Sequence, residues 1–339
     1  MINTLSICPT CYKKIPAQIV CQYNTAWMIK TCDVHGKFET IVDPEYSHVA
    51  AYYNTTTLGK NKAILVPINS DCNMSCEWCY TKDVSTEIKP PEFYNNQLLE
   101  LRLQGYTMLL SGGEPTIIPG FFAYCADLMR MGWPVVTMSN MIKFADKEFL
   151  EEFVGIGLVT NKTLHADFSM QHPRNYDGMV CANKFQALAN IESLGLKANC
   201  IQFSIQDLDE LDWIRSFYDM TKHLYRNIRI RTMYGFWNDK SPKIYLSQLH
   251  RRFMEVFGDL TPVQGDTIES SNLYSIYMRD EHCGISLSSA PTVHNVDTRV
   301  AQRPTYAYAQ DGKFYSFPVA QIINEGIQKG WYGGFKICN

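Results

Sequence analysis

The sequence lacks the features that would place a protein in or across a membrane. No uninterrupted apolar run approaches the roughly 18 to 20 residues that a bilayer-spanning helix needs. The opening residues MINTLSICPTCYKK contain no basic segment followed by a long apolar core, so we expect no signal peptide. The net charge of −3 argues against a broad polyanion-binding surface and gives no strong nucleic-acid signature. These absences predict a cytoplasmic protein without a membrane span.

Cysteine, in contrast, is abundant, with 12 residues in a chain of 339. A disulfide framework is not expected, because a reducing compartment keeps thiols free. Four cysteines lie within the first 32 residues, and three more lie between positions 72 and 79, so metal ligation explains both groups. The others are isolated, and we expect small buried apolar side chains at Cys125, Cys181, Cys200, Cys283 and Cys338.

From about residue 62 to residue 235, apolar strand-like runs alternate with amphipathic helical segments. We expect strands at 62–69, 106–113, 134–140, 163–170, 197–205 and 227–235. We expect helices at 90–104, 118–131 and 145–154, one at 177–196 with Phe185, Leu188, Ile191 and Leu194 on one stripe, and one that carries Leu208, Leu211, Ile214 and Phe217. Such alternation implies right-handed crossovers and a parallel sheet, in either an open doubly wound form or a partial barrel.

The segments outside this β/α block, 62–235, differ from it. Residues 1–45 are too few to form a hydrophobic core of their own and need a bound metal to stabilise their fold. We therefore expect a small Cys-rich metal-knuckle module there. Residues 236–339 show no clear β/α rhythm. Their Tyr-rich stretches, such as SNLYSIYM and RPTYAYAQDGKFYSF, predict a C-terminal α+β extension that caps the substrate side.

Polar motifs follow three consecutive predicted strands at the point where each strand ends. Asp71 to Cys79 follow the first strand, and Ser139 and Asn140 follow the third. The second strand is followed by Gly112, Gly113, Glu114 and Pro115. Because ligands bind at the carboxyl ends of parallel strands, we expect these motifs to converge on one rim and form the site.

The first of these motifs, SDCNMSCEWCYTKD at 70–83, contains Cys72, Cys76 and Cys79 in a C-x3-C-x2-C spacing. This spacing is poor for a four-cysteine zinc site, which normally uses two CxxC pairs. Three thiolates on one loop suit three corners of a cubane [4Fe–4S] cluster. The fourth iron is then open for a substrate or cofactor.

The segment CNMSCEWCY, with SGGEP after the next predicted strand, resembles the signature motifs of the radical S-adenosylmethionine (SAM) superfamily. The resemblance implies that the six β/α units form that family's partial (β/α)6 TIM-type barrel. It implies that Cys72, Cys76 and Cys79 ligate the [4Fe–4S] cluster and that SAM chelates the fourth iron. The reduced cluster would cleave SAM to a 5′-deoxyadenosyl radical, which abstracts hydrogen from an unactivated C–H bond. An electron donor such as flavodoxin or ferredoxin is the implied partner.

The resemblance also implies how the first three loops hold SAM. Trp78 and Tyr80 would shelter the cluster and flank the adenine. Residues 112–115 would receive the SAM amino group through carbonyls that glycine lets approach closely. Ser139 and Asn140 stand where related proteins contact the ribose.

The later strands supply further candidates for SAM contacts. Asp167, Ser169 and Gln171 would contact the ribose or the carboxylate. Arg229 and Arg231 alternate along the last predicted strand and therefore face the same side. One of them, for which we choose Arg231, would bind the SAM carboxylate, although an exterior ion pair is the alternative for either.

The N-terminal cysteines have the spacing of a zinc ribbon. CPTC at 8–11 and TCDVHG at 31–36 offer Cys8, Cys11, Cys32 and His35, a CxxC knuckle paired with a CxxH knuckle. Cys21 is an alternative to His35, and four thiolates would make mononuclear iron as suitable as zinc.

This segment, CPTCYKKIPAQIV followed by MIKTCDVHGKFE, is similar to the N-terminal element of the pterin methyltransferase-like and tetraether lipid synthase-like radical SAM proteins. Those relatives are longer and bear additional cysteine-rich cluster sites, whereas the cysteines after residue 80 are isolated here. We therefore expect no auxiliary cluster, and structural roles for the EHC segment at 281–283 and for His294. Because this sequence lacks the additional cysteine-rich sites of those relatives, their methyl-transfer or lipid-coupling activity cannot be assigned to it directly.

The leading hypothesis is a radical SAM enzyme, a transferase or oxidoreductase that acts on an unactivated C–H bond by alkylation or C–C bond formation. The alternative is radical modification of a peptide or nucleotide. A third hypothesis, from another class, is a noncatalytic iron–sulfur or zinc adaptor, which would not cleave SAM.

Overall fold

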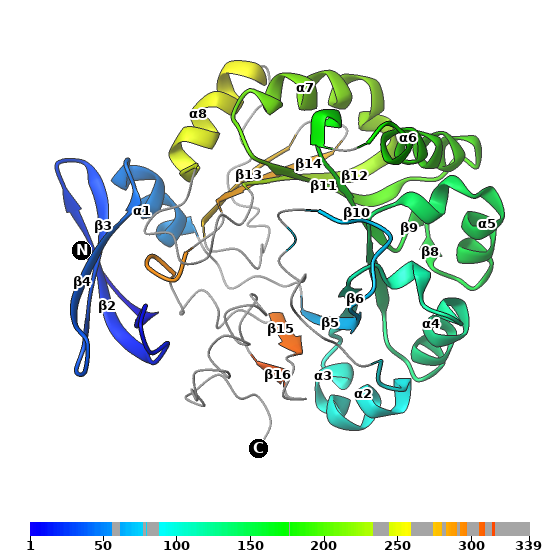
Figure 1. Ribbon diagram of the computed structural model, residues 1–339, viewed down its shortest axis with the longest axis horizontal. Coiled ribbons are helices and arrows are strands. Elements are labelled where there is room, and N and C mark those ends of the chain that lie inside the picture. The colour runs from blue at the N-terminus through cyan, green and yellow to red at the C-terminus, as the bar shows by residue number, and fades with distance from the viewer. Residues whose placement is uncertain are drawn as a thin grey trace.

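The computed structural model describes residues 1–55, 62–76, 79, 88–175, 177–232, 244–258, 274–279, 283–289, 292–296, 305–308 and 314–315. A four-stranded sheet at the N-terminus stands beside a ten-stranded sheet that curves as a partial barrel (Figure 1). The α/β fold class expected from the sequence is confirmed. Among the described helices, none is long and apolar enough to cross a membrane.

The N-terminal sheet is antiparallel, with its strands in chain order. It consists of β1 (Ile2–Ile7), β2 (Lys14–Gln22), β3 (Thr25–Cys32) and β4 (Gly36–Asp43), and helix α1 (Tyr46–Thr55) follows it. Metal ligation is not its sole stabiliser, because Ile19 and Met28 are fully buried in the same hydrophobic cluster as the barrel core. The Ser6 hydroxyl also donates a hydrogen bond to the Val296 carbonyl at 2.6 Å. The module is therefore docked on the rest of the chain.

The large sheet has the strand order β13-β14-β12-β11-β10-β7-β6-β5-β15-β16. Its strands are β5 (Ala63–Asn69), β6 (Thr107–Gly112), β7 (Val135–Ser139), β10 (Ala166–Met170), β11 (Ala198–Ile205), β12 (Tyr225–Thr232), β13 (Tyr274–Arg279), β14 (Gly284–Ser289), β15 (Thr305–Tyr308) and β16 (Phe314–Tyr315). The neighbours from β5 through β12 are parallel, as the β/α alternation predicted. Strand β5 is rich in branched aliphatic residues because both its faces are covered: Ile64, Val66 and Ile68 are fully buried on one face, and Pro67 and Asn69 are buried on the other.

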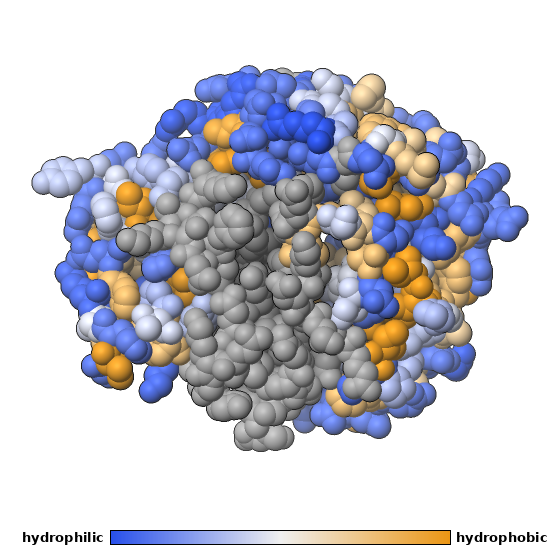
Figure 2. Space-filling model, viewed as in Figure 1, coloured by the Kyte–Doolittle hydropathy of each residue, from blue (hydrophilic) through white to orange (hydrophobic). Residues whose placement is uncertain are grey.

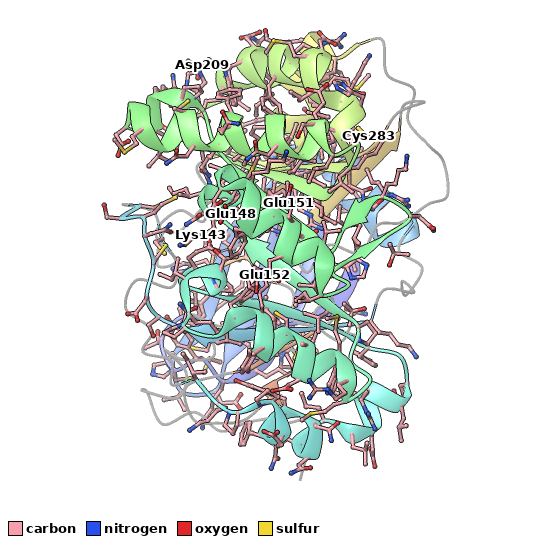
Figure 3. The ribbon with its side chains drawn as sticks, turned by 90° about the vertical axis from the view of Figure 1, so that its right-hand side faces the viewer. Lys143, Glu148, Glu151, Glu152, Asp209 and Cys283 are labelled. Carbon is pink, nitrogen blue, oxygen red and sulfur yellow. The ribbon has the colours of Figure 1, made fainter. Side chains whose placement is uncertain are left out.

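The helices lie outside the curved sheet, where Figure 1 shows α4 to α7 following one another around it. They are α2 (Pro91–Gln97), α3 (Leu99–Leu103), α4 (Phe121–Arg130), α5 (Lys147–Gly155), α6 (Gly178–Ser193), α7 (Glu210–Thr221) and α8 (Leu246–Val256). Helix α5 shows why they pack this way. Its Leu150 and Phe153 are fully buried in the hydrophobic core, where Phe153 packs on Phe121 and Phe144, whereas Glu148, Glu151 and Glu152 are exposed on its other side (Figure 3).

The viewed face of the molecule is largely hydrophilic over α7, with hydrophobic residues in separate patches on the right-hand side (Figure 2). Large apolar side chains that remain exposed on the helices include Leu103, Met179 and Met220. Because exposed apolar residues that occur singly are normal on soluble domains, these residues do not by themselves mark a binding surface.

Three sequence-based element boundaries are wrong. The helix expected at 90–104 is two short helices, because the buried Leu98 adopts a non-helical backbone with φ −125° between them. The strand expected at 163–170 is split, since β9 (Thr163–Leu164) pairs with β8 (Val159–Thr160) and only β10 joins the large sheet. The last strand begins at Tyr225, and residues 233–235 lie outside the described residues.

The expectation that residues 236–339 lack a β/α rhythm is also wrong for their first part. Helix α8 leads to β14, which pairs in parallel with β12 and so extends the barrel sheet beyond six units. The sequence GISLSS hides this strand, because its serines are buried along with its aliphatic residues. Strand β15 likewise adds to the other side of the sheet, in parallel with β5.

Candidate functional site

A cavity lies at the carboxyl ends of the parallel strands, on the rim expected from the sequence. Predicted site residues that line it are Cys72, Cys76, Cys79, Gly112, Gly113, Glu114, Ser139, Asn140, Asp167, Ser169, Gln171 and Arg231. Pro115 begins the short 3-10 helix that follows this loop and is not part of the lining. Trp78 and Tyr80 lie outside the described residues. The topology thus brings together motifs from five strands.

Six lining residues were not singled out in the sequence. They are Met74, Ser111, Met138, Phe168, Gln202 and Ser204. Ser111, Met138 and Phe168 belong to strands whose ends were recognised, and extending each motif back along its strand would have included them. Gln202 and Ser204 lie on β11, which carries no motif, so only its place in the sheet identifies them.

The three cysteines of the loop after β5 share the cavity without forming a tight group. Among the described residues, ligand atoms within 4.8 Å of one another occur in the N-terminal group and not at this loop. A single tetrahedral zinc ion would need sulfur atoms about 3.7 Å apart, given Zn–S bonds of about 2.3 Å. At least one pair of the three sulfur atoms is therefore too far apart for a single tetrahedral zinc ion.

Desolvation raises the pKa of the Cys76 thiol, which is half-buried, and also that of the Cys72 thiol, although Cys72 is exposed as a residue. A metal bound here would have to displace their protons, and its positive charge would stabilise the thiolates. The Asn140 side-chain amide lies close enough to donate a hydrogen bond to Cys72 Sγ, at 3.8 Å, and to Asn73 Oδ1, at 2.6 Å. Asn140 thus contacts the cysteine loop itself, in addition to lining the cavity.

Gly112 and Gly113 are required by the approach of the cysteine loop. A Cβ atom on Gly112, which has φ +127°, would lie 2.2 Å from the Asn69 carbonyl oxygen, and one on Gly113 would lie 2.0 Å from the Asp71 carbonyl oxygen. Backbone hydrogen bonds join the two segments, from Gly113 N to Asn69 O at 2.8 Å and from Glu114 N to Asp71 O at 2.7 Å. The glycines were expected only to let SAM approach closely; in the structure they pack one loop on the other.

Glu114 joins the loop after β6, to which it belongs, to the loop after β7, which contains Asn140. Its side chain is buried, and Oε1 accepts hydrogen bonds from Thr116 N at 3.1 Å, Thr116 Oγ1 at 2.6 Å and Ser139 Oγ at 2.9 Å. Its Oε2 accepts from Asn140 N at 2.6 Å. Burial raises the pKa of Glu114, and these hydrogen bonds oppose that shift. Both oxygens accept from backbone N–H groups, an arrangement that matches a carboxylate.

Replacing Glu114 with glutamine is therefore expected to weaken the hydrogen bonds that hold the two loops together, although the two side chains have nearly the same shape. In either orientation the amide NH2 would face a backbone N–H, of Thr116 or of Asn140, so at least one hydrogen bond is lost. A hydrogen bond to a charged group contributes about 1.5–3 kcal/mol, and we expect a loss of stability in that range together with weaker SAM binding. Thermal unfolding with and without SAM measures both effects. Unchanged stability and SAM binding would contradict the role assigned to this carboxylate.

The opposite wall of the cavity is polar and charged. Asp167 accepts a hydrogen bond from Asn199 Nδ2 at 2.6 Å, and burial raises its pKa while Arg229 and Arg231 oppose that shift. Arg231 is only 7% exposed and lines the cavity, so the alternative of an exterior ion pair is wrong for it. Among the described residues, the buried Gln171 Oε1 has no hydrogen-bond partner. This wall offers a carboxylate, a guanidinium and an amide to a polar ligand.

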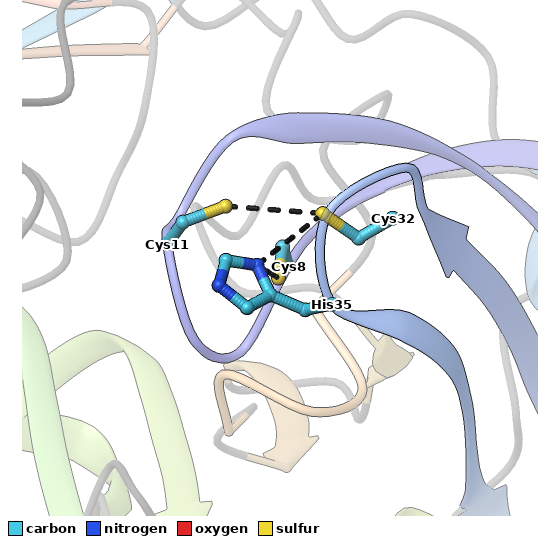
Figure 4. Close-up of side chains that lie close together, drawn as sticks. All are labelled: Cys8, Cys11, Cys32 and His35. Carbon is cyan, nitrogen blue, oxygen red and sulfur yellow. Dashed lines mark hydrogen bonds between the residues drawn. The ribbon is translucent and has the colours of Figure 1, made fainter.

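A second cluster lies in the N-terminal sheet, where the two knuckles face each other (Figure 4). Cys8, Cys11, Cys32 and His35 place their ligand atoms within 4.8 Å of one another. Nδ1 of His35 is 3.6 Å from Cys8 Sγ and 3.5 Å from Cys32 Sγ, and Cys11 Sγ is 3.9 Å from Cys32 Sγ. These distances match the edges of a tetrahedron around zinc, about 3.7 Å for two sulfur atoms and slightly less for sulfur and nitrogen.

Cys21, the alternative to His35, is exposed on β2 and does not belong to this group. The Val34 backbone N–H and other hydrogen bonds lower the pKa of Cys32 to about 6, which favours the thiolate that a metal needs.

The isolated cysteines largely follow expectation. Cys125, Cys200 and Cys283 are buried, whereas Cys181 is only half-buried and Cys338 lies outside the described residues. In the EHC segment, Glu281 and His282 lie outside the described residues, and Cys283 Sγ lies 3.9 Å from the Tyr218 hydroxyl. The backbone N–H of His294 donates to Thr292 Oγ1 within a turn.

The N-terminal sheet matches a family model. Residues 2–44 match the one described as "HMPTM N-terminal zinc ribbon domain". That match covers the first sheet together with all four ligands of the N-terminal cluster.

Two curated proteins are similar to parts of the chain. It is 28% identical over 192 residues to the 7,8-dihydro-6-hydroxymethylpterin dimethyltransferase of Methanocaldococcus jannaschii, covering 47% of this chain and 38% of that protein. It is 29% identical over 87 residues to an S-adenosylmethionine-dependent nucleotide dehydratase of a Thermoplasmatales archaeon, covering 25% of this chain and 32% of that protein. The chain thus spans about a third of the length of these relatives.

Two solved structures of Streptococcus suis SuiB share the fold. The complex with the precursor peptide SuiA aligns with a TM-score of 0.54 at 12% identity, over 82% of this chain and 64% of that one. The complex with S-adenosylmethionine aligns with a TM-score of 0.53 at 14% identity, over 80% and 63%.

The chain shares its fold with the SuiB structures and has three cysteines at the rim of its partial barrel. This agrees with the resemblance to the radical SAM superfamily that the sequence motifs carry. The N-terminal sheet matches the HMPTM zinc ribbon model, and part of the chain is similar to the pterin dimethyltransferase.

Proposed function

We propose that this chain is a radical SAM enzyme in which Cys72, Cys76 and Cys79 hold a [4Fe–4S] cluster and the fourth iron binds SAM. The observation that supports this most is that the three thiols, the GGE loop and a charged wall line one cavity at the barrel rim. When bound, the cluster would supply the one electron that cleaves SAM to methionine and a 5′-deoxyadenosyl radical, which would abstract hydrogen from an unactivated C–H bond of the substrate.

The residues of the chain hold and orient the reactants in this proposal. The backbone of 112–114, fixed by the cysteine loop and by Glu114, receives the SAM amino group. Arg231 and Gln171 would bind the SAM carboxylate or ribose, which is supported by their lining the same cavity as the cysteines. Gln171 and Arg231 are buried, and exclusion of water from this wall would protect a radical from competing hydrogen donors. The N-terminal cluster holds zinc, or mononuclear iron, as a structural site.

The substrate reaction is proposed by analogy with two groups of relatives. The pterin dimethyltransferase and the matching zinc ribbon favour alkylation or C–C bond formation. The nucleotide dehydratase, and the SuiB complex with a precursor peptide, favour the alternative, radical modification of a nucleotide or peptide. Flavodoxin or ferredoxin is the proposed electron donor.

The test is SAM cleavage by the reconstituted protein. The full chain is reconstituted with iron and sulfide without oxygen, its [4Fe–4S] content is verified, and dithionite and SAM are added. We expect 5′-deoxyadenosine to form in proportion to cluster content. A protein with a verified cluster that forms none would contradict the proposal and favour the third hypothesis, a noncatalytic adaptor. Deuterium transfer from labelled pterins, nucleotides or peptides into 5′-deoxyadenosine then distinguishes the substrate classes.

A further inference from the structure

A lysine is fully buried on the sheet-facing side of α6. The other buried residues of this face include Ala187, Leu188 and Ile191, as expected for a helix that covers a barrel, but Lys184 occupies the position one turn before them with 0% exposure. Its Nζ donates a hydrogen bond to the Ser169 carbonyl at 2.7 Å, at the carboxyl end of β10. Ser169 lines the cavity and Lys184 does not, so the ammonium lies behind the cavity wall.

The groups that act electrostatically on this lysine belong largely to the candidate cluster site. Burial lowers the pKa of Lys184 to about 7, and Cys76, Glu114, Cys181 and Cys72 act in the opposite direction. Conversely, Lys184 lowers the pKa of Cys76, which burial raises. In an interior of low dielectric constant, such interactions act over longer distances than in water. Lys184 is therefore coupled to the cysteine loop without lining the cavity.

We propose that the positive charge of the Lys184 ammonium stabilises the reduced form of the cluster and so raises the reduction potential of the cluster. This inference rests on the proposed function. The oxidised core carries two positive charges against three thiolates, and one electron from the donor makes the site more negative by one charge. The protonated lysine nearby favours that change, because net charge and surroundings set the potentials of iron–sulfur clusters. The electron comes from the donor, and no bond changes in this step.

The test is the midpoint potential of the cluster in Lys184→Met, measured without SAM by a potentiometric titration followed by electron paramagnetic resonance. Methionine keeps an unbranched side chain of similar length and removes the charge. We expect at least a tenfold lower ratio of reduced to oxidised cluster at a fixed potential. For one electron this is a shift of about 59 mV to more negative values. The potential is read on the fraction that carries a cluster, so lower occupancy does not affect it.

The matched control is Lys197→Met, which removes an equal charge from an exposed position just before β11, at the opposite end of the sheet. Solvent and salt screen that charge, so the midpoint potential of the cluster in Lys197→Met should equal that of the unaltered protein. If Lys184→Met also leaves the potential unchanged in a protein that binds the cluster and cleaves SAM, this inference fails and the proposed function stands. If the unaltered protein binds no cluster, both fail.

Discussion

Replacing Cys76 with alanine should reduce 5′-deoxyadenosine formation to the background level. The cluster would keep only two of its three protein ligands on the loop, and the iron that loses its thiolate would be open to solvent. We therefore expect iron and sulfide to fall well below four of each per chain after reconstitution, together with loss of the absorbance of the [4Fe–4S] cluster. Liquid chromatography of reactions with SAM and dithionite measures the product, and chemical analysis measures iron and sulfide.

The control for this variant is Cys125→Ala. Cys125 is fully buried on α4, and burial raises its pKa to about 12, so it is a neutral thiol in apolar surroundings. Its removal should lower stability by about 1 kcal/mol, as loss of a small buried group does, and leave product per cluster unchanged. Full activity in Cys76→Ala would show that the cluster ligands are assigned incorrectly.

Replacing Cys8 with alanine should have the largest effect on stability. Cys8 is fully buried among the four N-terminal ligands, and zinc sites of this kind contribute to folding directly. Loss of a structural metal belongs to the small class of changes that cost more than about 4 kcal/mol. We expect the metal bound by this module to be lost and thermal unfolding to shift to lower temperature. Metal analysis before reconstitution with iron, and circular dichroism during heating, test this.

Cys21→Ala provides the comparison within the same sheet. Cys21 is exposed on β2 and lies outside the ligand group, so its removal should change neither metal content nor the melting temperature measurably. If Cys21→Ala lost the metal and Cys8→Ala kept it, the four-ligand assignment would be wrong. Any fraction of Cys8→Ala that remains folded should still bind the [4Fe–4S] cluster, because the two sites lie on different sheets.

Local spacing explains why so much of the site was predictable. Metal–ligand bonds of about 2–2.3 Å restrict how far apart the ligands can lie. When the ligands belong to one loop or to two short knuckles, this restriction appears in the sequence as a characteristic spacing of cysteines and histidines. The parallel strands from β5 to β12 were equally visible, since burial on both faces requires runs of branched aliphatic residues. Strand β14 was missed because its buried serines do not produce such a run.

Helix α6 shows where periodicity fails. The stripe expected from the sequence contained Phe185, but Phe185 is 38% exposed and its neighbour Lys184 is fully buried. A hydrophobic pattern assigns a charged residue to the solvent side by default. Lys184 is instead turned inward, where the Ser169 carbonyl accepts its hydrogen bond.

By itself, the sequence determined the β/α order, the two groups of cysteines and the polar rim, because each depends on residues that are neighbours along the chain. Only the tertiary structure decided that His35 and not Cys21 completes the N-terminal group. It also decided that Gly112 and Gly113 pack against the cysteine loop, that Glu114 joins two loops, and that Lys184 lies behind the cavity. These features depend on atoms brought together from distant segments, and their burial and hydrogen bonds exist only once the sheet has closed around them.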